Sequence, residues 1–252
     1  MRRIALYVKD SIRSGSPNLY ESLMRLLGSS FEIVGPEEAD VVVSVGGDGT
    51  FLLVARGLPE DKPILGVNMG KRGAVTDALP EDLPLVVRRL PEGDYCVEDR
   101  IKLTASTSSG SYEAINEFYV ARRDAGPTPS YSVRVRSDEV YSERMDGLII
   151  STPTGSTGYN LSAGGPVLPE TASSLIVTPV LPLLKVPPIV IPVEDDLYVD
   201  VESSSSFALV VDGQLKVEPE GKEVRFTPSR NRLRVVRLRR TPFQHLRKTL
   251  CG

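Results

Sequence analysis

The sequence predicts two halves of different fold class: a Rossmann-like α/β domain over residues 1–98 and an all-β sandwich domain over residues 99–238. In the first half, apolar strand segments alternate with amphipathic helix segments, which is the pattern of a doubly wound parallel sheet. After Asp99 the segments become short and β-rich. Prolines and glycines separate them roughly every 8–12 residues, a spacing typical of a sandwich.

The expected elements of the first half are strands at Ile4–Val8, Val41–Val45 and Ile64–Asn68, helices at Leu19–Leu27 and Leu83–Leu90, and a helix that starts at Phe51–Arg56. Ligands of doubly wound sheets bind beyond the carboxyl ends of the strands. Two glycine-containing segments, Gly46–Thr50 and Asn68–Gly73, lie at or directly after the ends of such strands. We therefore expect the ligand site of this half at these two segments.

The expected strands of the second half are Leu103–Ser106, Ala114–Ala121, Tyr131–Arg136, Leu148–Thr152, Leu175–Pro179, Ile189–Val193, Leu197–Val201, Ala208–Val211, Val224–Thr227 and Leu233–Leu238. Residues 239–252 follow as a third segment. Apolar residues there recur at i, i+3 and i+7, as Phe243, Leu246 and Leu250. This spacing predicts an amphipathic last helix that docks on another part of the protein.

The turn between Val45 and Phe51 has the composition of a phosphate site, with Gly46, Gly47, Asp48, Gly49 and Thr50 in succession. Glycines let backbone N–H groups approach a phosphate closely. No lysine follows in the Walker position, so the P-loop form is excluded. A carboxylate here would repel a bare phosphate; we expect Asp48 to orient or deprotonate an attacking hydroxyl, or to hold Mg²⁺. The alternative is a plain strand-to-helix turn in which Asp48 caps the helix.

A second polar segment, Asp146–Pro166, joins a buried strand to a long run of glycine, serine, threonine and asparagine. Such a run cannot form a core. Its many small donors and acceptors suit a polyhydroxylated ligand that bears phosphate, and Tyr159 can stack on a base. A serine-rich connecting loop is the alternative, although the length is unusual for one. Two polar glycine loops in different halves suggest that both halves bind one ligand.

Composition excludes several classes of function. The net charge of −3 gives no whole-chain reason for nucleic-acid binding. Without a signal peptide or a membrane-spanning run we expect a cytoplasmic protein that has no membrane partner and keeps Cys96 and Cys251 as free thiols. The single histidine, His245, makes a histidine-based triad or zinc site improbable.

Taken together, the motifs resemble the NAD kinase family in order, spacing and identity. They are Gly46–Thr50, the pair Asn116-Glu117, the run Asp146–Pro166, the triplet Asp212-Gly213-Gln214 and the closing Phe243–Leu250 segment. Diacylglycerol kinases, sphingosine kinases and phosphofructokinases have loops similar to the first motif. The Thr152–Tyr159 segment is far more specific.

The resemblance implies phosphorylation of the adenosine-ribose 2′-hydroxyl of NAD by ATP or polyphosphate, with Asp48 as general base. Mg²⁺ would be carried on the donor phosphates, and no protein metal site is assigned. The last helix would return to the N-terminal domain, and the assembly would be a homodimer or homotetramer. The implied phosphate-loop residues are Gly46, Gly47 and Thr50, and the implied NAD-binding residues are Asp48, Gly49, Asn116, Glu117, Arg144, Asp146, Thr157, Gly158, Tyr159, Asn160, Leu161, Ser162 and Gln214.

The sequence departs from the family pattern at three places. Gly70–Val75 replaces a Gly-x-Leu-Gly-Phe-Leu-like loop, Val180–Leu184 replaces a Cys-Pro-His-like turn, and Gly158 stands where alanine is frequent. Lys71 and Arg72 could serve the donor phosphates. Two other functions remain alternatives: a lipid or sugar kinase that shares the first loop, and a non-catalytic NAD(P)-binding sensor. The polar second loop disfavours the lipid kinase, and Asp48 disfavours the sensor.

Overall fold

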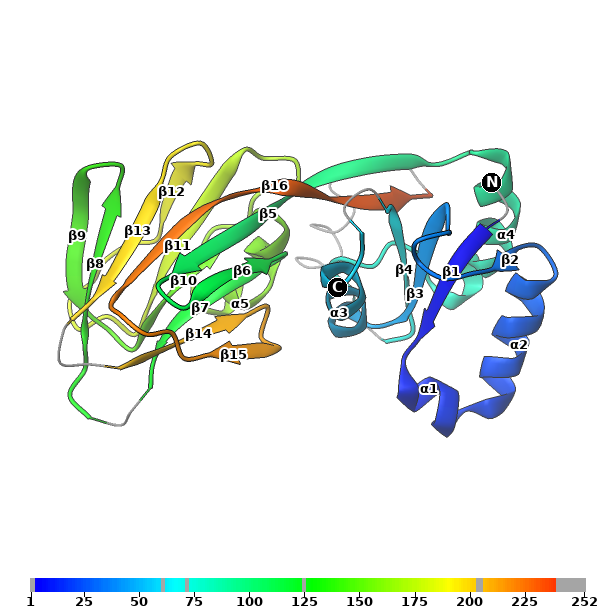
Figure 1. The fold of residues 1–252 in the computed structure, drawn as a ribbon, viewed down its shortest axis with the longest axis horizontal. Coiled ribbons are helices and arrows are strands. Elements are labelled where there is room, and N and C mark those ends of the chain that lie inside the picture. Colours follow the sequence, from blue (N-terminus) through cyan, green and yellow to red (C-terminus); the bar gives the residue numbers. More distant parts are fainter. Residues whose placement is uncertain (1–2, 60–61, 71–72, 124–125, 203–205, 239–252) are drawn as a thin grey trace. The chain divides into compact units, whose positions relative to one another are not determined.

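The computed structural model describes residues 3–59, 62–70, 73–123, 126–202 and 206–238. The chain forms two compact units. Unit 1 contains residues 1–100 and 233–252, and unit 2 contains residues 101–232. Two long strands, β5 (Cys96–Thr107) and β16 (Glu223–Arg237), each contribute residues to both units (Figure 1). The predicted last helix, Phe243–Leu250, lies outside the described residues.

Unit 1 is an α/β domain, as predicted. Its sheet has the order β2-β1-β3-β4-β16 and every pairing in it is parallel. The other elements are β1 (Arg3–Val8), α1 (Asp10–Gly15), α2 (Pro17–Gly28), β2 (Glu32–Ile33), β3 (Val41–Gly46), α3 (Asp48–Arg56), β4 (Ile64–Asn68), the 3₁₀ helix η1 (Pro80–Asp82) and α4 (Leu83–Glu92).

The core of unit 1 forms because the strands are apolar on both faces. All six residues of β3 are buried, and so are all five of β4. Continuous apolar runs are typical of parallel strands that are covered on both faces. Leu23 and Leu27 of α2 and Val86 and Leu90 of α4 pack into the same core. The core fixes β3 and β4 side by side, and Gly46 pairs with Asn68 at their carboxyl ends.

Unit 2 is a β-sandwich, as predicted. One sheet has the order β12-β11-β10-β7-β14-β15, and the other contains β16-β13-β8-β9 with β5 and β6. Residues from both sheets share one apolar core. The remaining elements are β6 (Gly110–Ala114), β7 (Glu117–Arg122), β8 (Ser130–Val135), β9 (Asp138–Arg144), β10 (Gly147–Ser151), η2 (Thr154–Thr157), α5 (Tyr159–Ser162), β11 (Ser174–Val180), β12 (Ile189–Pro192), β13 (Leu197–Val201), β14 (Phe207–Val211) and β15 (Leu215–Val217).

Some sequence expectations are wrong in detail. Val224–Thr227 and most of Leu233–Leu238 belong to one long strand, β16, which ends at Arg237 and runs through the exposed residues Arg230 and Arg232 that separate the two expected strands. Ala114–Ala121 is not one strand, since it breaks between β6 and β7. The sequence analysis also missed α1, the two-residue β2, the polar hairpin strand β9 and the short β15, all of which lack a buried periodic pattern.

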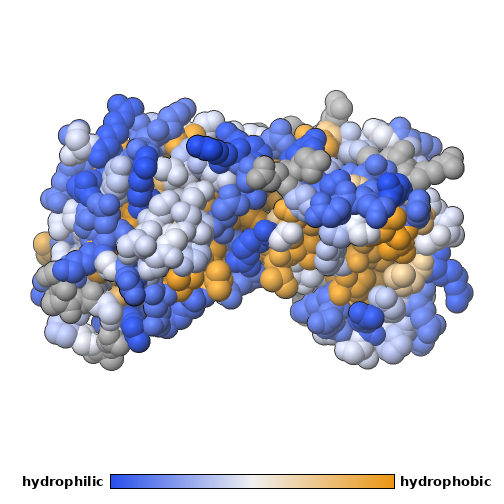
Figure 2. Space-filling view, in the orientation of Figure 1, coloured by the Kyte–Doolittle hydropathy of each residue, from blue (hydrophilic) through white to orange (hydrophobic). Residues whose placement is uncertain are grey.

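Hydrophilic residues cover much of the visible face of unit 2 (Figure 2). Among the described residues, no helix has both the length and the apolar composition that crossing a membrane requires.

Candidate active site

Helix α3 begins at Asp48, three residues before the helix start expected from the apolar pattern. Strand β3 ends at Gly46, and Gly47 lies in an extended conformation between strand and helix. The N-cap residue of α3 is Gly47, and the Asp48 carboxylate accepts its hydrogen bonds from residues 74–76. The alternative interpretation of Asp48 as a helix cap is therefore wrong, and its carboxylate is used elsewhere.

The Asp48 carboxylate accepts three hydrogen bonds from the segment after β4. The backbone N–H of Ala74 donates to Oδ2 at 2.8 Å and that of Val75 to Oδ1 at 3.3 Å. The Thr76 hydroxyl also donates to Oδ1, at 3.2 Å. A carboxylate has about four acceptor positions, so the contacts with described residues leave one position, on Oδ2, for another hydroxyl.

Segment 73–76 can approach Asp48 because residue 73 is a glycine. A Cβ at Gly73 would lie 2.1 Å from the Thr76 hydroxyl oxygen and 2.8 Å from Asn68 Nδ2. Asn68 in turn closes the preceding turn, since its Oδ1 accepts from the N–H of Gly70 at 3.0 Å. Ala74 and Val75, which lie in the segment that departs from the family pattern, thus provide backbone donors to the Asp48 carboxylate.

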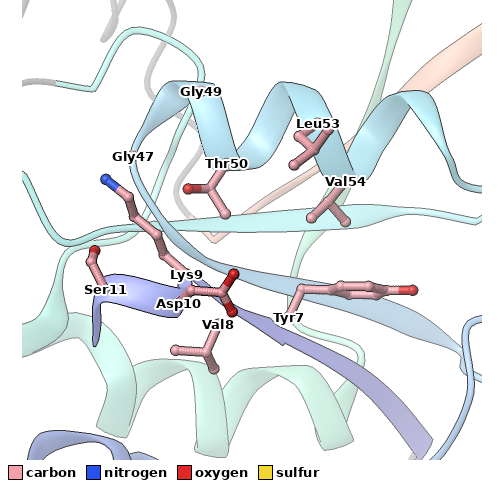
Figure 3. Close-up of a pocket in the computed structure, with 10 residues that line it drawn as sticks. All are labelled: Tyr7, Val8, Lys9, Asp10, Ser11, Gly47, Gly49, Thr50, Leu53 and Val54. Carbon is pink, nitrogen blue, oxygen red and sulfur yellow. The ribbon is translucent and has the colours of Figure 1, made fainter. Parts of the chain in front are cut away.

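A cavity of about 470 Å³ lies beside the glycine turn (Figure 3). Polar groups of Lys9 and Ser11 line it from the region after β1, and Gly47, Gly49 and Thr50 line it from the start of α3. The amino group of Lys9 points toward the glycine turn in Figure 3. The Lys9 ammonium and the positive end of the α3 dipole suit an anion, while the carboxylate of Asp10 also lines the cavity. The ring of Tyr7 and the aliphatic side chains of Leu53 and Val54 form its apolar part.

In unit 2 the pair Asn116-Glu117 lies against the second polar loop. The Thr152 N–H donates to the Asn116 carbonyl oxygen at 2.9 Å. A Cβ at Gly155 would lie 2.2 Å from that same oxygen. Only glycine therefore permits this approach of η2 to the pair.

Several buried oxygens around this contact have no hydrogen-bond partner among the described residues. They are Oδ1 of Asn116, Oε2 of Glu117, and Oγ1 of Thr154 and of Thr157. Buried polar groups without partners are rare and call for an explanation. These four belong to two segments in contact, so they fit a polar ligand that supplies their hydrogen bonds.

Burial raises the pKa of Glu117 to about 8, with the nearby negative charge of Asp212 as the second cause. Glu117 is 6% exposed. At neutral pH its carboxyl group is therefore largely protonated and can both donate and accept a hydrogen bond.

The other predicted NAD-binding residues have different environments. The Tyr159 ring is 43% exposed and meets the ring of Tyr119 edge to face, with centroids 5.3 Å apart. Leu161 is half-buried and Ser162 exposed. Asn160 is fully buried, and its amide is occupied inside the loop: Nδ2 donates to the carbonyl oxygens of Ser156 and Pro166, and Oδ1 accepts from Thr178.

Arg144 and Asp146 each have a separate partner. The Arg144 Nε donates to the Thr128 carbonyl oxygen at 3.1 Å, while the Asp146 carboxylate lies 3.3 Å from Arg122. The two side chains remain at adjacent ends of β9 and β10. Both are partly exposed, so a ligand can reach them.

Gln214 closes the hairpin between β14 and β15. Its N–H donates to the Val211 carbonyl oxygen at 2.9 Å, and Asp212 and Gly213 have φ of 49° and 65°. Positive φ at both central residues is the geometry of a type I′ turn, for which an Asp-Gly pair is a preferred sequence. The Gln214 side chain is exposed.

The sequence analysis missed three features of the site: the donors of residues 74–76, Lys9 and the contacts of Asp212. Backbone donors have no side-chain signature, so residues 74–76 could not have been found. A lysine directly after an apolar strand, and an Asp-Gly pair at the end of another, were available signals. Lys71 and Arg72 lie outside the described residues. Over residues 3–59, 62–70, 73–123, 126–202 and 206–238, no group of three or more His, Cys, Asp or Glu could hold a metal ion.

Comparisons with known proteins agree with this geometry. Residues 13–95 match the ATP-NAD kinase N-terminal domain, and residues 115–238 match the ATP-NAD kinase C-terminal domain. An NAD kinase of Porphyromonas gingivalis is 33% identical over 221 residues, covering 85% of this chain and 77% of the relative. An NAD kinase of Methanopyrus kandleri is 35% identical over 215 residues, covering 84% and 78%.

Solved structures give the same result. The crystal structure of an NAD kinase from Archaeoglobus fulgidus in complex with ATP has a TM-score of 0.80 and 28% identity, covering 100% of this chain and 96% of that one. A yeast NADH kinase complexed with NADH shares the fold, with a TM-score of 0.83 and 20% identity over 100% of this chain and 87% of that one. The extent of these matches shows that the chain belongs to the NAD kinase family.

Proposed function

We propose that this enzyme transfers a phosphoryl group from ATP to the 2′-hydroxyl of the adenosine ribose of NAD, giving NADP, with Asp48 as the general base. Kinase activity on NAD with ATP follows from the family. The observation that carries the finer proposal is the Asp48 carboxylate, held by three hydrogen bonds with one acceptor position left.

Asp48 acts mainly by position. An ordinary carboxylate is a weak base for an alcohol, but in a loose phosphoryl-transfer transition state the attacking hydroxyl loses its proton late. The remaining acceptor position on Oδ2 would hold that hydroxyl, and the donors of residues 74–76 would keep the carboxylate from rotating. Orientation of this kind supplies much of the rate enhancement when two substrates must meet.

The unpartnered oxygens of Asn116, Glu117 and Thr157 would bind the ribose hydroxyls and phosphates of NAD, while Tyr159 would stack on an aromatic ring of the substrate. Arg144, Asp146 and Gln214 remain proposed contacts at the margin of the site. Asn160 supports the loop rather than a ligand hydroxyl, since its amide groups are already used.

The phosphates of ATP would lie at the cavity beside the glycine turn. Lys9 and the N–H groups at the start of α3 are the positive groups there. The described residues offer no group of ligands for a protein-held metal ion, so a divalent cation such as Mg²⁺ would be carried by the donor phosphates.

A homodimer or homotetramer is also part of the proposal. Leu181, Leu183 and Leu184 are 73%, 60% and 69% exposed, and the Leu183 N–H bonds the Arg144 carbonyl oxygen. An exposed apolar cluster next to a proposed contact residue favours a subunit interface. Sedimentation velocity tests this: a monomer at micromolar concentration would contradict it.

The test of the catalytic assignment is NADP formation from NAD, ATP and Mg²⁺ by the parent and by Asp48→Asn. An NADP-specific dehydrogenase detects the product, so that a 3′-phosphate is not counted. We expect kcat to fall by roughly 10²–10⁴ in the variant. Asp94→Asn is the control, because it removes an exposed carboxylate of unit 1 that pairs with Arg89, and it should retain the parent rate.

The asparagine would also present an amide N–H₂ group to the donors of residues 74–76, so thermal unfolding of both variants accompanies the assay. Equal rates of parent and Asp48→Asn would remove Asp48 as base and leave the kinase. No NADP from the parent, with polyphosphate also tried as donor, would refute the proposed function and favour a non-catalytic NAD-binding protein.

A further inference from the structure

The polypeptide between β6 and β7 leaves regular strand pairing at Ile115 and Asn116. Ile115 is 1% exposed and Glu117 is 6% exposed. Backbone N–H groups in such a buried break need acceptors from outside the sheet, because an unpaired buried donor is strongly unfavourable. A single side chain accepts the hydrogen bonds of the backbone N–H groups in this break.

The Asp212 carboxylate accepts hydrogen bonds from three consecutive backbone N–H groups. Asn116 donates to Oδ1 at 2.7 Å, Ile115 donates to Oδ1 at 3.0 Å, and Glu117 donates to Oδ1 at 3.3 Å. Ile115 N also lies 3.2 Å from Oδ2. In return, the Asp212 N–H donates to the Glu117 carbonyl oxygen at 3.0 Å. The hairpin turn and the Asn116-Glu117 backbone are thus joined in both directions.

These contacts exceed what a turn requires. A type I′ turn needs residues that tolerate positive φ, and asparagine or glycine serves as well as aspartate. The turn alone therefore does not explain a carboxylate, 6% exposed, that is aimed at residues 115–117.

We propose that Asp212 is a positioning residue of the NAD site, which fixes the backbone of residues 115–117 so that the Asn116 and Glu117 side chains present their unpartnered oxygens to NAD. The inference depends on the proposed function for the identity of the ligand. It assigns Asp212 no contact with the substrate. Asp212 acts through the pair Asn116-Glu117, and the Asn116 carbonyl oxygen accepts a separate hydrogen bond from the Thr152 N–H.

The negative charge of Asp212 gives the proposal a second, measurable consequence. Asp212 is the charged group that raises the pKa of Glu117 beyond the effect of burial. The other elements around Glu117 present uncharged residues: Ser151 opposite it on β10, and Gly158 in the loop. Loss of the Asp212 charge should therefore lower the pKa of Glu117, while burial keeps it above that of an exposed glutamate.

Two substitutions separate geometry from charge. Asp212→Gly removes the acceptor but suits a residue with φ of 49°. Asp212→Asn keeps the turn, since Asn-Gly is a favoured type I′ pair. Its amide oxygen can still accept from the three N–H groups, but the negative charge is removed. Asp195→Asn is the matched control, since Asp195 is a carboxylate of unit 2, 8% exposed, that bonds Arg136 instead.

The readouts are KM for NAD, KM for ATP, kcat, and NAD binding by calorimetry, with kcat/KM for NAD followed from pH 6 to 9.5. For Asp212→Gly we expect KM for NAD to rise roughly 30-fold or more, with KM for ATP unchanged. For Asp212→Asn we expect a rise of about threefold to fivefold and an inflection near pH 8 that moves to lower pH. Glu117→Gln should abolish that inflection, and Asp195→Asn should match the parent.

A purely structural role would lower kcat and the unfolding temperature while both KM values stay at the parent level, and this result would overturn the proposal. An Asp212→Asn variant with the parent's KM for NAD and an unmoved inflection would do the same, even if Asp212→Gly fails to fold. If the parent makes no NADP but binds NAD, and Asp212→Gly weakens that binding, the proposed function fails while the positioning role stands.

Discussion

The two units hold their polar site groups in opposite states. In unit 1 the Asp48 carboxylate accepts three hydrogen bonds from residues 74–76. In unit 2 Asn116 Oδ1, Glu117 Oε2 and Thr157 Oγ1 have no partner among the described residues, although the backbone N–H groups of Asn116 and Glu117 are bonded to Asp212. The Asp48 carboxylate is thus held in place by the protein alone, whereas the unpartnered oxygens of unit 2 are free to accept hydrogen bonds from a ligand.

This contrast fits the roles that we propose for these groups. A base that acts by position gains from being immobilised in advance, because the orientation is then already present when the substrate binds. Groups that recognise a hydroxylated ligand gain from being unpartnered, because each hydrogen bond to the ligand then satisfies a buried atom. Stability in unit 1 and ligand affinity in unit 2 should therefore respond differently to similar substitutions.

The largest expected effect is that of Gly155→Ala in unit 2. The new Cβ would lie 2.2 Å from the Asn116 carbonyl oxygen and 2.5 Å from its carbon, so backbone must move. We expect the free energy of unfolding to fall by about 3 kcal/mol and NAD binding to be lost. Urea unfolding and calorimetry measure the two.

Gly158→Ala is the control in the same loop. Its nearest neighbours are the Gly155 carbonyl oxygen at 3.2 Å and Glu117 Oε2 at 3.3 Å, a tight fit that small shifts can relieve. We expect a loss below about 1 kcal/mol. Equal stability of Gly155→Ala and the parent would show that the close backbone approach in unit 2 does not constrain the site.

The second effect is a pH dependence of stability that arises from Glu117. Its pKa of about 8 in the folded state lies above the ordinary glutamate pKa of 4.5, so the folded state binds the proton more tightly than the unfolded state between these two pH values. Stability must then fall as pH rises from about 4.5 to 8 and level off above it. Between pH 6 and pH 8 the deprotonation of Glu117 should lower the free energy of unfolding by roughly 2 kcal/mol.

Glu117→Gln removes this contribution, since a glutamine does not titrate. Thermal unfolding of parent and variant at several pH values should show the variant gaining stability relative to the parent as pH rises from 6 to 8. A constant difference between the two curves would contradict the raised pKa and weaken the contrast between the units.

The smallest effect is expected from replacing a threonine by valine, once in each unit. Thr76→Val in unit 1 removes a hydroxyl that bonds Asp48, and we expect unfolding to become about 1.5 kcal/mol easier. Thr157→Val in unit 2 removes a hydroxyl without a partner, so stability should stay within about 0.5 kcal/mol of the parent.

Kinetics complete this comparison. Thr76→Val should lower kcat with KM for NAD unchanged, because the base loses one restraint, whereas Thr157→Val should raise KM for NAD several-fold. If both variants behaved alike in stability and in kinetics, the distinction between hydrogen-bonded groups in unit 1 and unpartnered groups in unit 2 would be wrong.

The α/β and β-sandwich fold classes could be predicted because they follow from local patterns. Val41–Val45 is apolar except for Ser44, and Leu23 and Leu27 repeat at helical spacing, so burial dictates strand and helix without knowledge of the partners. Strand β9 could not be predicted, since none of its residues is buried and its pairing with β8 alone makes it a strand.

Residue order by itself indicated the residues to which we assign the chemistry: Asp48 in its glycine turn, the pair Asn116-Glu117 and the polar loop around Tyr159. Only the tertiary structure decided how they are held. Asp48 is bonded to a segment 26–28 residues away, and Asn116 to Asp212, 96 residues away. Contacts between backbone groups and distant side chains leave no periodic trace along the chain, because they depend on where the folded core brings strand ends together.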